Sequence, residues 1–180
     1  MILLKILLCI LIADFFTGII HWFEDAYGNP NWSFGLGQVI KDNIIHHEQP
    51  EKFLEGSLFE RIKVSLVIAS ILFAIFYLLG FMNWYVGITL AYASLSNQIH
   101  AIGHVKQTNK VIILLQRIGL IQSKEMHDLH HSSPYDINYC VMTNYLNPIL
   151  TYINFWYKVE NLLSLIGIKT TRGLNIRKGV

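Results

Sequence analysis

Residues 2–20 have the sequence ILLKILLCILIADFFTGII, and this apolar run decides the fold class. Its length approaches the roughly 20 apolar residues that a helix needs to cross a bilayer. A cleaved signal peptide is the competing interpretation. It is disfavoured because Asp14 interrupts the run and no small-residue cleavage site follows it. The run therefore predicts a membrane-spanning helix near the N-terminus.

Two further apolar runs, 62–80 and 81–99, meet at the turn Gly80-Phe81-Met82-Asn83 and predict a helical hairpin. The composition agrees, because only 14% of the residues are charged, against about 25% in a soluble domain. The sequence therefore predicts a single all-α domain over residues 1–180. We expect it to be a multi-pass membrane protein with three to four transmembrane helices, of which three are clear.

Two later segments, 109–121 and 149–166, are expected to form interfacial helices that lie on the membrane surface. The second carries Tyr152, Phe155, Trp156 and Tyr157, and aromatic rings of this kind prefer the headgroup region. A fourth true span near 145–166 is the main alternative.

The positive charges predict the orientation. Of 14 Lys and Arg residues, only Lys5 lies at the N-terminal end, and the turn between the second and third runs has none. The positive-inside rule then places the loop 23–61 and the C-terminal part in the cytoplasm. On this topology the glycosylation triplet at Asn31 faces the wrong side to be used. The small size favours a bacterial inner membrane, or the endoplasmic reticulum if the chain is eukaryotic.

Eight histidines dominate the polar residues of the chain. They stand at the ends of the predicted spans or in the predicted cytoplasmic segments: His21, His46, His47, His100, His104, His127, His130 and His131. All eight therefore fall on one side of the membrane. A net charge of +2, with no basic arm, gives no indication of nucleic-acid binding.

The spacing of these histidines predicts metal binding. His100 and His104 are four residues apart, so both rings leave one helix face. His130 and His131 follow His127 by three and four residues, so these rings also leave one helix face. A lone histidine or an isolated pair often binds no metal. The histidines form four groups along the sequence, and four groups on one side of the membrane favour a shared site. The groups are His21, His46 with His47, His100 with His104, and His127 with His130 and His131. Imidazole suits iron, zinc and copper. A structural zinc takes only four ligands, so eight histidines indicate two metal ions.

Three polar neighbours are further candidates. Asp14, Gly18, His21 and Asp25 follow one helical stripe. We expect Asp14 to accept the second N–H of a histidine, with a purely structural role as the alternative. Asp25 could be a ligand or support one, and Asn43 could hold a metal-bound water. The two cysteines, Cys9 and Cys140, are far apart in the sequence. We expect both to be buried and to pack as apolar side chains.

Four ordered blocks resemble the plasmanylethanolamine desaturase (CarF/Kua) family, from about residue 13 to 160. The first is DFFTGIIHW at 14–22, with Asp25 and Gly28 after it. The second is HHEQP at 46–50, and the third is NQIH at 97–100 with His104. The fourth is HDLHHSSP at 127–134, leading to Tyr139-Cys140 and Asn147. The segment between His100 and His104 is Ala-Ile-Gly, where relatives often carry a bulkier one with tryptophan.

The resemblance implies an oxygen-dependent oxidoreductase. Members desaturate the alkyl ether chain of a plasmanyl phospholipid to the vinyl ether of a plasmalogen, and a plant relative makes a trans double bond in an acyl chain. The eight histidines would bind two Fe²⁺ ions, O₂ would be the co-substrate, and a cytochrome- or ferredoxin-type donor would supply electrons. An acyl-lipid desaturase or a hydroxylase is the alternative enzyme. The non-enzyme alternatives are a metal transporter and a structural zinc protein.

Overall fold

The computed structural model describes residues 1–171, apart from the side chain of Glu51, so residues 172–180 of the expected domain lie outside it. Every regular element within this range is a helix, which confirms the all-α class. In chain order the helices are α1 (Ile2–Tyr27), α2 (Leu36–Glu48), the 3-10 helix η1 (Pro50–Leu54), α3 (Leu58–Leu78), α4 (Trp84–Ala93), α5 (Ser96–His104), α6 (Lys110–Arg117), α7 (Lys124–His130), α8 (Leu146–Tyr152) and α9 (Phe155–Leu165).

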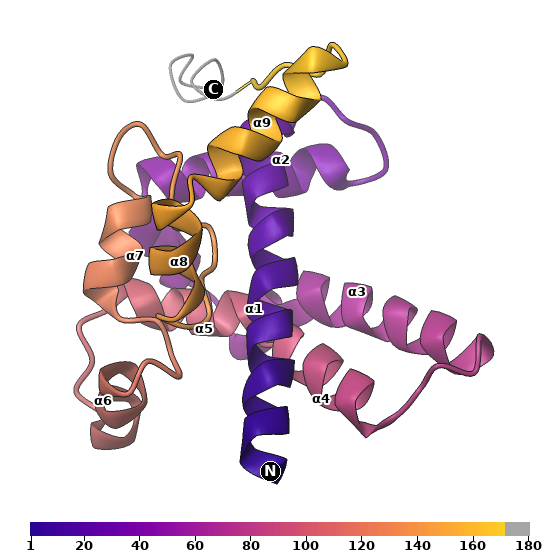
Figure 1. Cartoon of the computed structure of the whole chain (residues 1–180). Helices are drawn as coiled ribbons and strands as arrows, with labels where there is room; N and C mark the ends of the chain where they lie inside the picture. The colour runs from indigo at the N-terminus through magenta and orange to yellow at the C-terminus, as the bar shows by residue number, and fades with distance from the viewer. Residues whose placement is uncertain (172–180) are drawn as a thin grey trace.

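Helix α1 is a long central element, and α2, α4 and α8 contact it (Figure 1). One stripe of α1 is exposed and apolar, with Leu4, Leu8 and Ile12 at four-residue steps. The other stripe is buried and includes Asp14 and His21. Because exposed apolar stripes of this length are stable in lipid rather than in water, α1 has the surface of a membrane helix.

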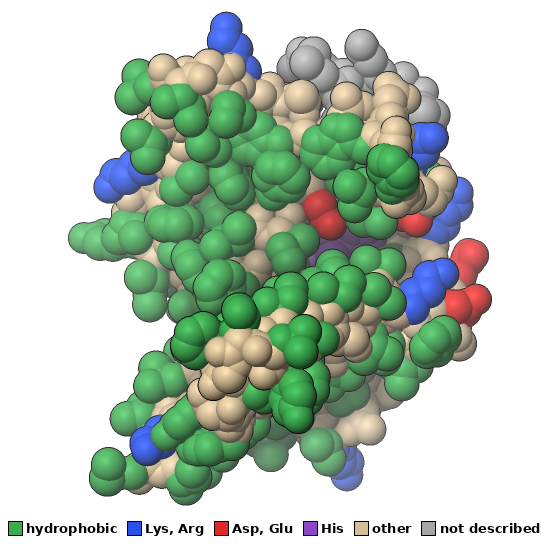
Figure 2. All heavy atoms as spheres, turned by 90° about the vertical axis from the view of Figure 1, so that its right-hand side faces the viewer, with side chains coloured by type: hydrophobic (Ala, Val, Ile, Leu, Met, Phe, Trp, Pro, Cys, Tyr) green, Lys and Arg blue, Asp and Glu red, His purple; other side chains and the backbone are tan. Residues whose placement is uncertain are grey.

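Helix α3 begins at a capping box, in which Ser57 and Glu60 exchange hydrogen bonds. All residues of α3 are described, and only Ala69 is buried. Within the described residues, α1 and α3 are the two helices long and apolar enough to cross a membrane. Figure 2 shows how much of the surface is apolar on the side of the molecule that carries the α3–α4 hairpin.

The segment 81–99, expected to be one span, is two helices. Asn83 caps α4 by accepting from the backbone N–H groups of Tyr85 and Val86, which agrees with the predicted turn. Helix α4 then ends at Ala93. The Ser94 hydroxyl donates back to the Ala91 carbonyl, and the Ser94 carbonyl accepts from Ser65 of α3. These serine bonds compete with the helical hydrogen bonds, and α5 begins as a separate element.

The C-terminal segment is also divided. The expected helix 149–166, or fourth span near 145–166, is formed by α8 and α9, which are separated by Asn154 in the left-handed region at φ 52°. Neither helix approaches the roughly 20 residues of a span. Helix α6 is shorter than the expected 109–121. The interfacial position of α6 and α9 stays a prediction.

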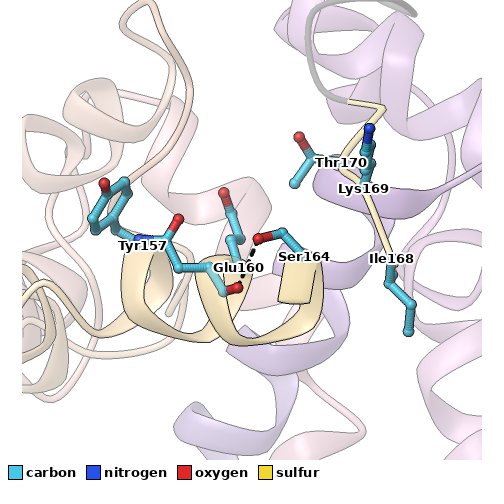
Figure 3. A pocket seen from close by; sticks show the side chains of 7 residues that line it. Tyr157, Glu160, Ser164, Ile168, Lys169 and Thr170 are labelled. Atoms are coloured by element: carbon cyan, nitrogen blue, oxygen red, sulfur yellow. Dashed lines mark hydrogen bonds between the residues drawn. The ribbon is translucent and has the colours of Figure 1, made fainter. Parts of the chain in front are cut away.

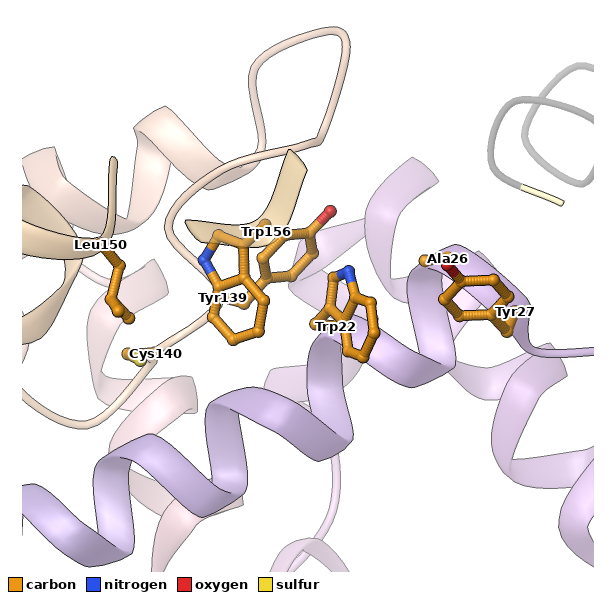
Figure 4. Packing of buried hydrophobic residues seen from close by; sticks show 7 residues of the cluster. All are labelled: Trp22, Ala26, Tyr27, Tyr139, Cys140, Leu150 and Trp156. Atoms are coloured by element: carbon orange, nitrogen blue, oxygen red, sulfur yellow. The ribbon is translucent and has the colours of Figure 1, made fainter. Parts of the chain in front are cut away.

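A compact aromatic core joins the C-terminal part of α1 to residues 137–143 and α9. Figure 4 shows its members: Trp22, Ala26, Tyr27, Tyr139, Cys140, Leu150 and Trp156. The Trp22 and Trp156 rings are stacked with centroids 5.6 Å apart, and the Trp22 Nε1–H donates to Glu160 over 2.9 Å. This packing fixes the part of α1 that carries His21 against the segment that follows α7.

Candidate metal centre

The structure brings all eight histidines together, and their rings form two adjoining clusters. The five-histidine cluster comprises His46, His100, His104, His127 and His131, and the mixed cluster comprises His21, Asp25, His47 and His130. In each cluster the candidate ligand atoms lie within 4.8 Å of one another. The two clusters adjoin at His47 and His131, whose ring centroids are 4.8 Å apart.

Four Nε2 atoms of the five-histidine cluster form a closed ring. Around it the successive Nε2–Nε2 distances are 3.0 Å from His46 to His100 and 3.1 Å from His100 to His127. They are 2.8 Å from His127 to His104 and 3.1 Å from His104 back to His46. Nitrogens at the corners of a square, each about 2.1 Å from a metal ion as in metal–imidazole bonds, would stand about 3.0 Å apart. The four distances therefore match the spacing expected for imidazole nitrogens around one metal ion.

The mixed cluster is built around one carboxylate. Asp25 Oδ1 lies 3.1 Å from His47 Nε2, and Asp25 Oδ2 lies 3.4 Å from His130 Nε2 and 3.7 Å from His21 Nε2. Within the described part of the chain, Asp25 Oδ2 and the Nε2 atoms of His21 and His130 are buried without a hydrogen bond. Such atoms are costly unless something satisfies them. A cation between them would do so, and the donor set of three imidazoles and a carboxylate suits one.

Burial keeps the rings of the five-histidine cluster neutral. It lowers the pKa of His104 to about 4 and that of His131 to about 3. Burial also lowers the pKa of His100 and His127 well below the usual range, and the neighbouring imidazoles add to the effect. Neutral imidazole is the form that binds metals, so the site is ready to accept metal ions at neutral pH.

Asp14 does not take the place expected for it. Its carboxylate accepts hydrogen bonds from the backbone N–H groups of Met142 and Thr143 and from the Thr143 hydroxyl. Within the described residues none of its hydrogen bonds goes to a histidine, so the expectation that it holds a ring N–H is corrected. The Asp14 side chain projects from α1 into the irregular segment 137–143, and it satisfies the backbone there.

Asn43 lies beside the mixed cluster, and the expectation that it holds a metal-bound water stays a prediction. Its Nδ2–H donates to Asp25 Oδ1 over 2.6 Å, from the helix α2 that also carries His47. The amide therefore orients the carboxylate of the mixed cluster. Asp25 itself stands inside the mixed cluster, with the Nε2 atoms of three histidines within 3.7 Å of its carboxylate oxygens.

Two aromatic rings border the clusters. Phe53, on η1, lies with its centroid 4.8 Å from that of His46 and 5.1 Å from that of His100. The ring centroid of Tyr135 lies 5.4 Å from that of His47. Figure 2 shows histidine at the bottom of a recess in a largely apolar face. A separate surface groove of about 430 Å³ runs along α9, lined by Tyr157, Glu160, Ser164 and Lys169 among others (Figure 3), and none of its lining residues is a histidine.

Gln122 is the site residue that the sequence did not single out. It is fully buried, and its Oε1 lies 3.0 Å from His127 Nδ1. A lone glutamine five residues before a histidine carries no recognisable spacing, so only a requirement to satisfy a buried imidazole could have pointed to it.

The helical fold, its long apolar helices and its two buried histidine clusters define a class of membrane proteins whose histidines could hold metal ions. The lipid desaturase domain model matches residues 10–172, and the chain belongs to that family. This agrees with the resemblance carried by the four histidine-containing blocks. Together with the apolar helices, membership indicates a metal-dependent lipid desaturase in a membrane.

Individual relatives are similar over most of this chain. The "Probable fatty acid desaturase" of Acanthamoeba polyphaga mimivirus is 33% identical over 92% of this chain and 84% of its own length. The plasmanylethanolamine desaturase of Myxococcus xanthus is 28% identical over 88% of this chain, but the match spans only 59% of that protein. Plasmanylethanolamine desaturase 1 of Mus musculus is 25% identical over 85% of this chain and 61% of its own length. No solved structure matches.

Proposed function

We propose that this protein is an O₂-dependent di-iron desaturase that converts the alkyl ether chain of a plasmanyl phospholipid to the vinyl ether of a plasmalogen. The observation that carries the proposal is the pair of adjoining clusters, which use all eight histidines and Asp25. Two sites within one buried group match the two metal ions that the chemistry requires.

Each cluster would hold one iron. His46, His100, His104, His127 and His131 would bind the first ion, and His21, Asp25, His47 and His130 the second. Asn43 would orient Asp25 through their 2.6 Å hydrogen bond. Bound there, the iron pair supplies oxygen activation, which the side chains of the protein cannot provide by themselves.

The overall reaction balances with an outside reductant. The chain loses two hydrogens, a donor supplies two electrons and the medium two protons, and O₂ becomes two waters. We infer that the donor is a cytochrome- or ferredoxin-type protein that docks on the cytoplasmic face, where the positive-inside rule places the clusters.

The lipid chain would reach the clusters from the bilayer. The apolar stripe of α1 that carries Leu8 and Ile12 is exposed, and so is most of α3. The recess that shows histidine opens in this apolar face (Figure 2). The task of the protein is then to hold one carbon of the chain beside the clusters and to keep the rest away.

A second candidate reaction is desaturation of an acyl chain. It is favoured by the names of the viral relative and of the Arabidopsis thaliana relatives, which are called fatty acid desaturases. The ether reaction is favoured by the names of the Myxococcus xanthus and Mus musculus relatives. The two reactions share the metal site and differ in which carbon of the chain lies next to it.

Lipid analysis tests the proposal. The chain is expressed in a host that has alkyl ether phospholipids and a suitable reductase, with His104→Ala as the inactive control. Acid-labile alkenyl chains are expected, and a new ester-linked double bond would instead favour the acyl reaction. Metal analysis of the purified protein should give about two irons per chain, whereas a single zinc and no lipid product would overturn both reactions.

A further inference from the structure

Backbone carbonyl groups of residues 137–143 contact the Nδ1 atoms of two clustered histidines, on the side of each ring away from the cluster. His21 Nδ1 lies 3.2 Å from the Tyr139 carbonyl oxygen, and His130 Nδ1 lies 2.9 Å from the Ile137 carbonyl oxygen. A carbonyl oxygen accepts and cannot donate. Both rings must therefore carry their proton on Nδ1, which leaves the Nε2 lone pair facing the mixed cluster.

His127 has the same relation to this segment, but through a side chain. Its Nδ1 lies 3.0 Å from Gln122 Oε1, and Gln122 Nε2 lies 2.8 Å from the Cys140 carbonyl oxygen. Because that carbonyl can only accept, it must face the NH₂ end of the amide. The oxygen of the amide then faces His127, so Nδ1 must be the protonated nitrogen and Nε2 must be free for a metal.

The orientation of Gln122 is itself fixed by the fold. The Gln122 backbone N–H donates to the Met142 carbonyl over 2.9 Å. Asn147 holds Cys140 from the other side, since its Oδ1 accepts from the Cys140 N–H and its Nδ2 donates to the Cys140 carbonyl. Gln122 and Asn147 are both fully buried, so neither amide can turn toward water.

We propose that Gln122 is a positioning residue for the five-histidine cluster: it fixes the tautomer of His127 and so turns that ring's Nε2 toward the metal. The inference rests on the proposed function, because it assigns Gln122 a part in the same site. Partners of this kind hold a ligand in its binding form, and their loss typically weakens metal affinity by about 10–100-fold.

Cobalt binding to the full-length protein in detergent tests the proposal, with Co²⁺ alone as the probe in competition with a chelator. Gln122→Met removes both hydrogen bonds at similar volume and should weaken one of the two sites by about 10–100-fold. Gln122→Glu, whose carboxylic acid form keeps an oxygen toward His127 and can donate its O–H to the Cys140 carbonyl, should retain affinity within a few-fold. Gln116→Met is the matched control, because Gln116 donates to the Gln122 backbone carbonyl and not to a histidine.

A second measurement does not depend on metal. In metal-free protein with ¹⁵N-labelled histidine, the His127 resonances should show a proton on Nδ1, and Gln122→Met should populate the Nε2-protonated form. An Nε2 proton in the native protein, or unchanged Co²⁺ affinity in Gln122→Met, would overturn the proposal. Failure of the native protein to bind two ions would count against the proposed function, and the NMR result would still decide the role of Gln122.

Discussion

The Thr143 hydroxyl donates to Asp14 Oδ2 over 2.6 Å, although the two residues are 129 positions apart in the sequence. The same carboxylate accepts from the backbone N–H groups of Met142 and Thr143. The carboxylate of Asp14, on the long apolar helix α1, therefore binds an irregular segment and not a clustered histidine. The same segment positions His21 and His130, because their Nδ1–H groups donate to the carbonyls of Tyr139 and Ile137. Asp14 therefore supports these two histidines indirectly.

Asp14→Asn should lower stability by about 1–3 kcal/mol, because the NH₂ group of an amide would face backbone donors and leave buried groups unsatisfied. The thermal unfolding midpoint in detergent measures this loss. Asp128→Asn is the control, because Asp128 is an exposed partner of Lys124 and such pairs contribute little. Equal midpoints for Asp14→Asn and the native protein would contradict the anchoring role.

Asp25→Asn should remove one metal ion and leave the other. The change takes the charge from the mixed cluster, whereas the five-histidine cluster contains no part of Asp25. Metal analysis after purification is expected to fall from about two ions per chain to about one, with loss of product. Asp42→Asn alters an exposed carboxylate on α2 that bonds Gln38, and it should keep both ions. Retention of both ions in Asp25→Asn would show that Asp25 is not a ligand.

Asn43→Ala should weaken the mixed site without emptying it. The substitution removes the donor to Asp25 Oδ1 but keeps every candidate ligand, so a loss of about tenfold or more in affinity is expected. Chelator competition measures the change against the native protein. A complete loss of the ion, as severe as in Asp25→Asn, would instead place Asn43 itself among the ligands.

Gly18→Ala should displace the segment 137–143. A Cβ atom at this position would stand 2.7 Å from Cys140 Sγ and 3.2 Å from Cys140 Cα, and overpacking of this kind typically costs about 1–3 kcal/mol. Both the unfolding midpoint and the product yield should fall. Gly87→Ala is the matched control within a helix, because its Cβ would meet only the flexible end of Met82 at 3.4 Å.

Replacement of His47, His104, His130 or His131 by Ala should abolish product while the protein remains in the membrane. The four residues come from both clusters, so the result tests whether both are needed. Membrane fractionation with immunodetection measures retention, and lipid analysis measures product. Normal product from two or more of these variants would mean that the site is misassigned.

The sequence predicted the convergence of the histidines because span ends and helical spacing are local properties. It did not predict the break between α4 and α5, since the Ser94 carbonyl is held by Ser65 on another helix. It also misplaced Asp14. The helical stripe with His21 was correct, but the donors of Asp14 come from a distant segment with no periodicity. Gln122 escaped notice for the same reason, because its role depends on a carbonyl brought close by folding.

The carbonyl groups that hold His21 and His130 have a consequence for protein engineering and for divergence. An acceptor of this kind belongs to the peptide unit and is supplied by any amino acid that preserves the path of the backbone. The half-buried Ile137 could therefore be exchanged for side chains of other shapes without loss of the hydrogen bond to His130. Variation at such a position offers a way to alter the surroundings of the clusters while the candidate ligands themselves stay in place.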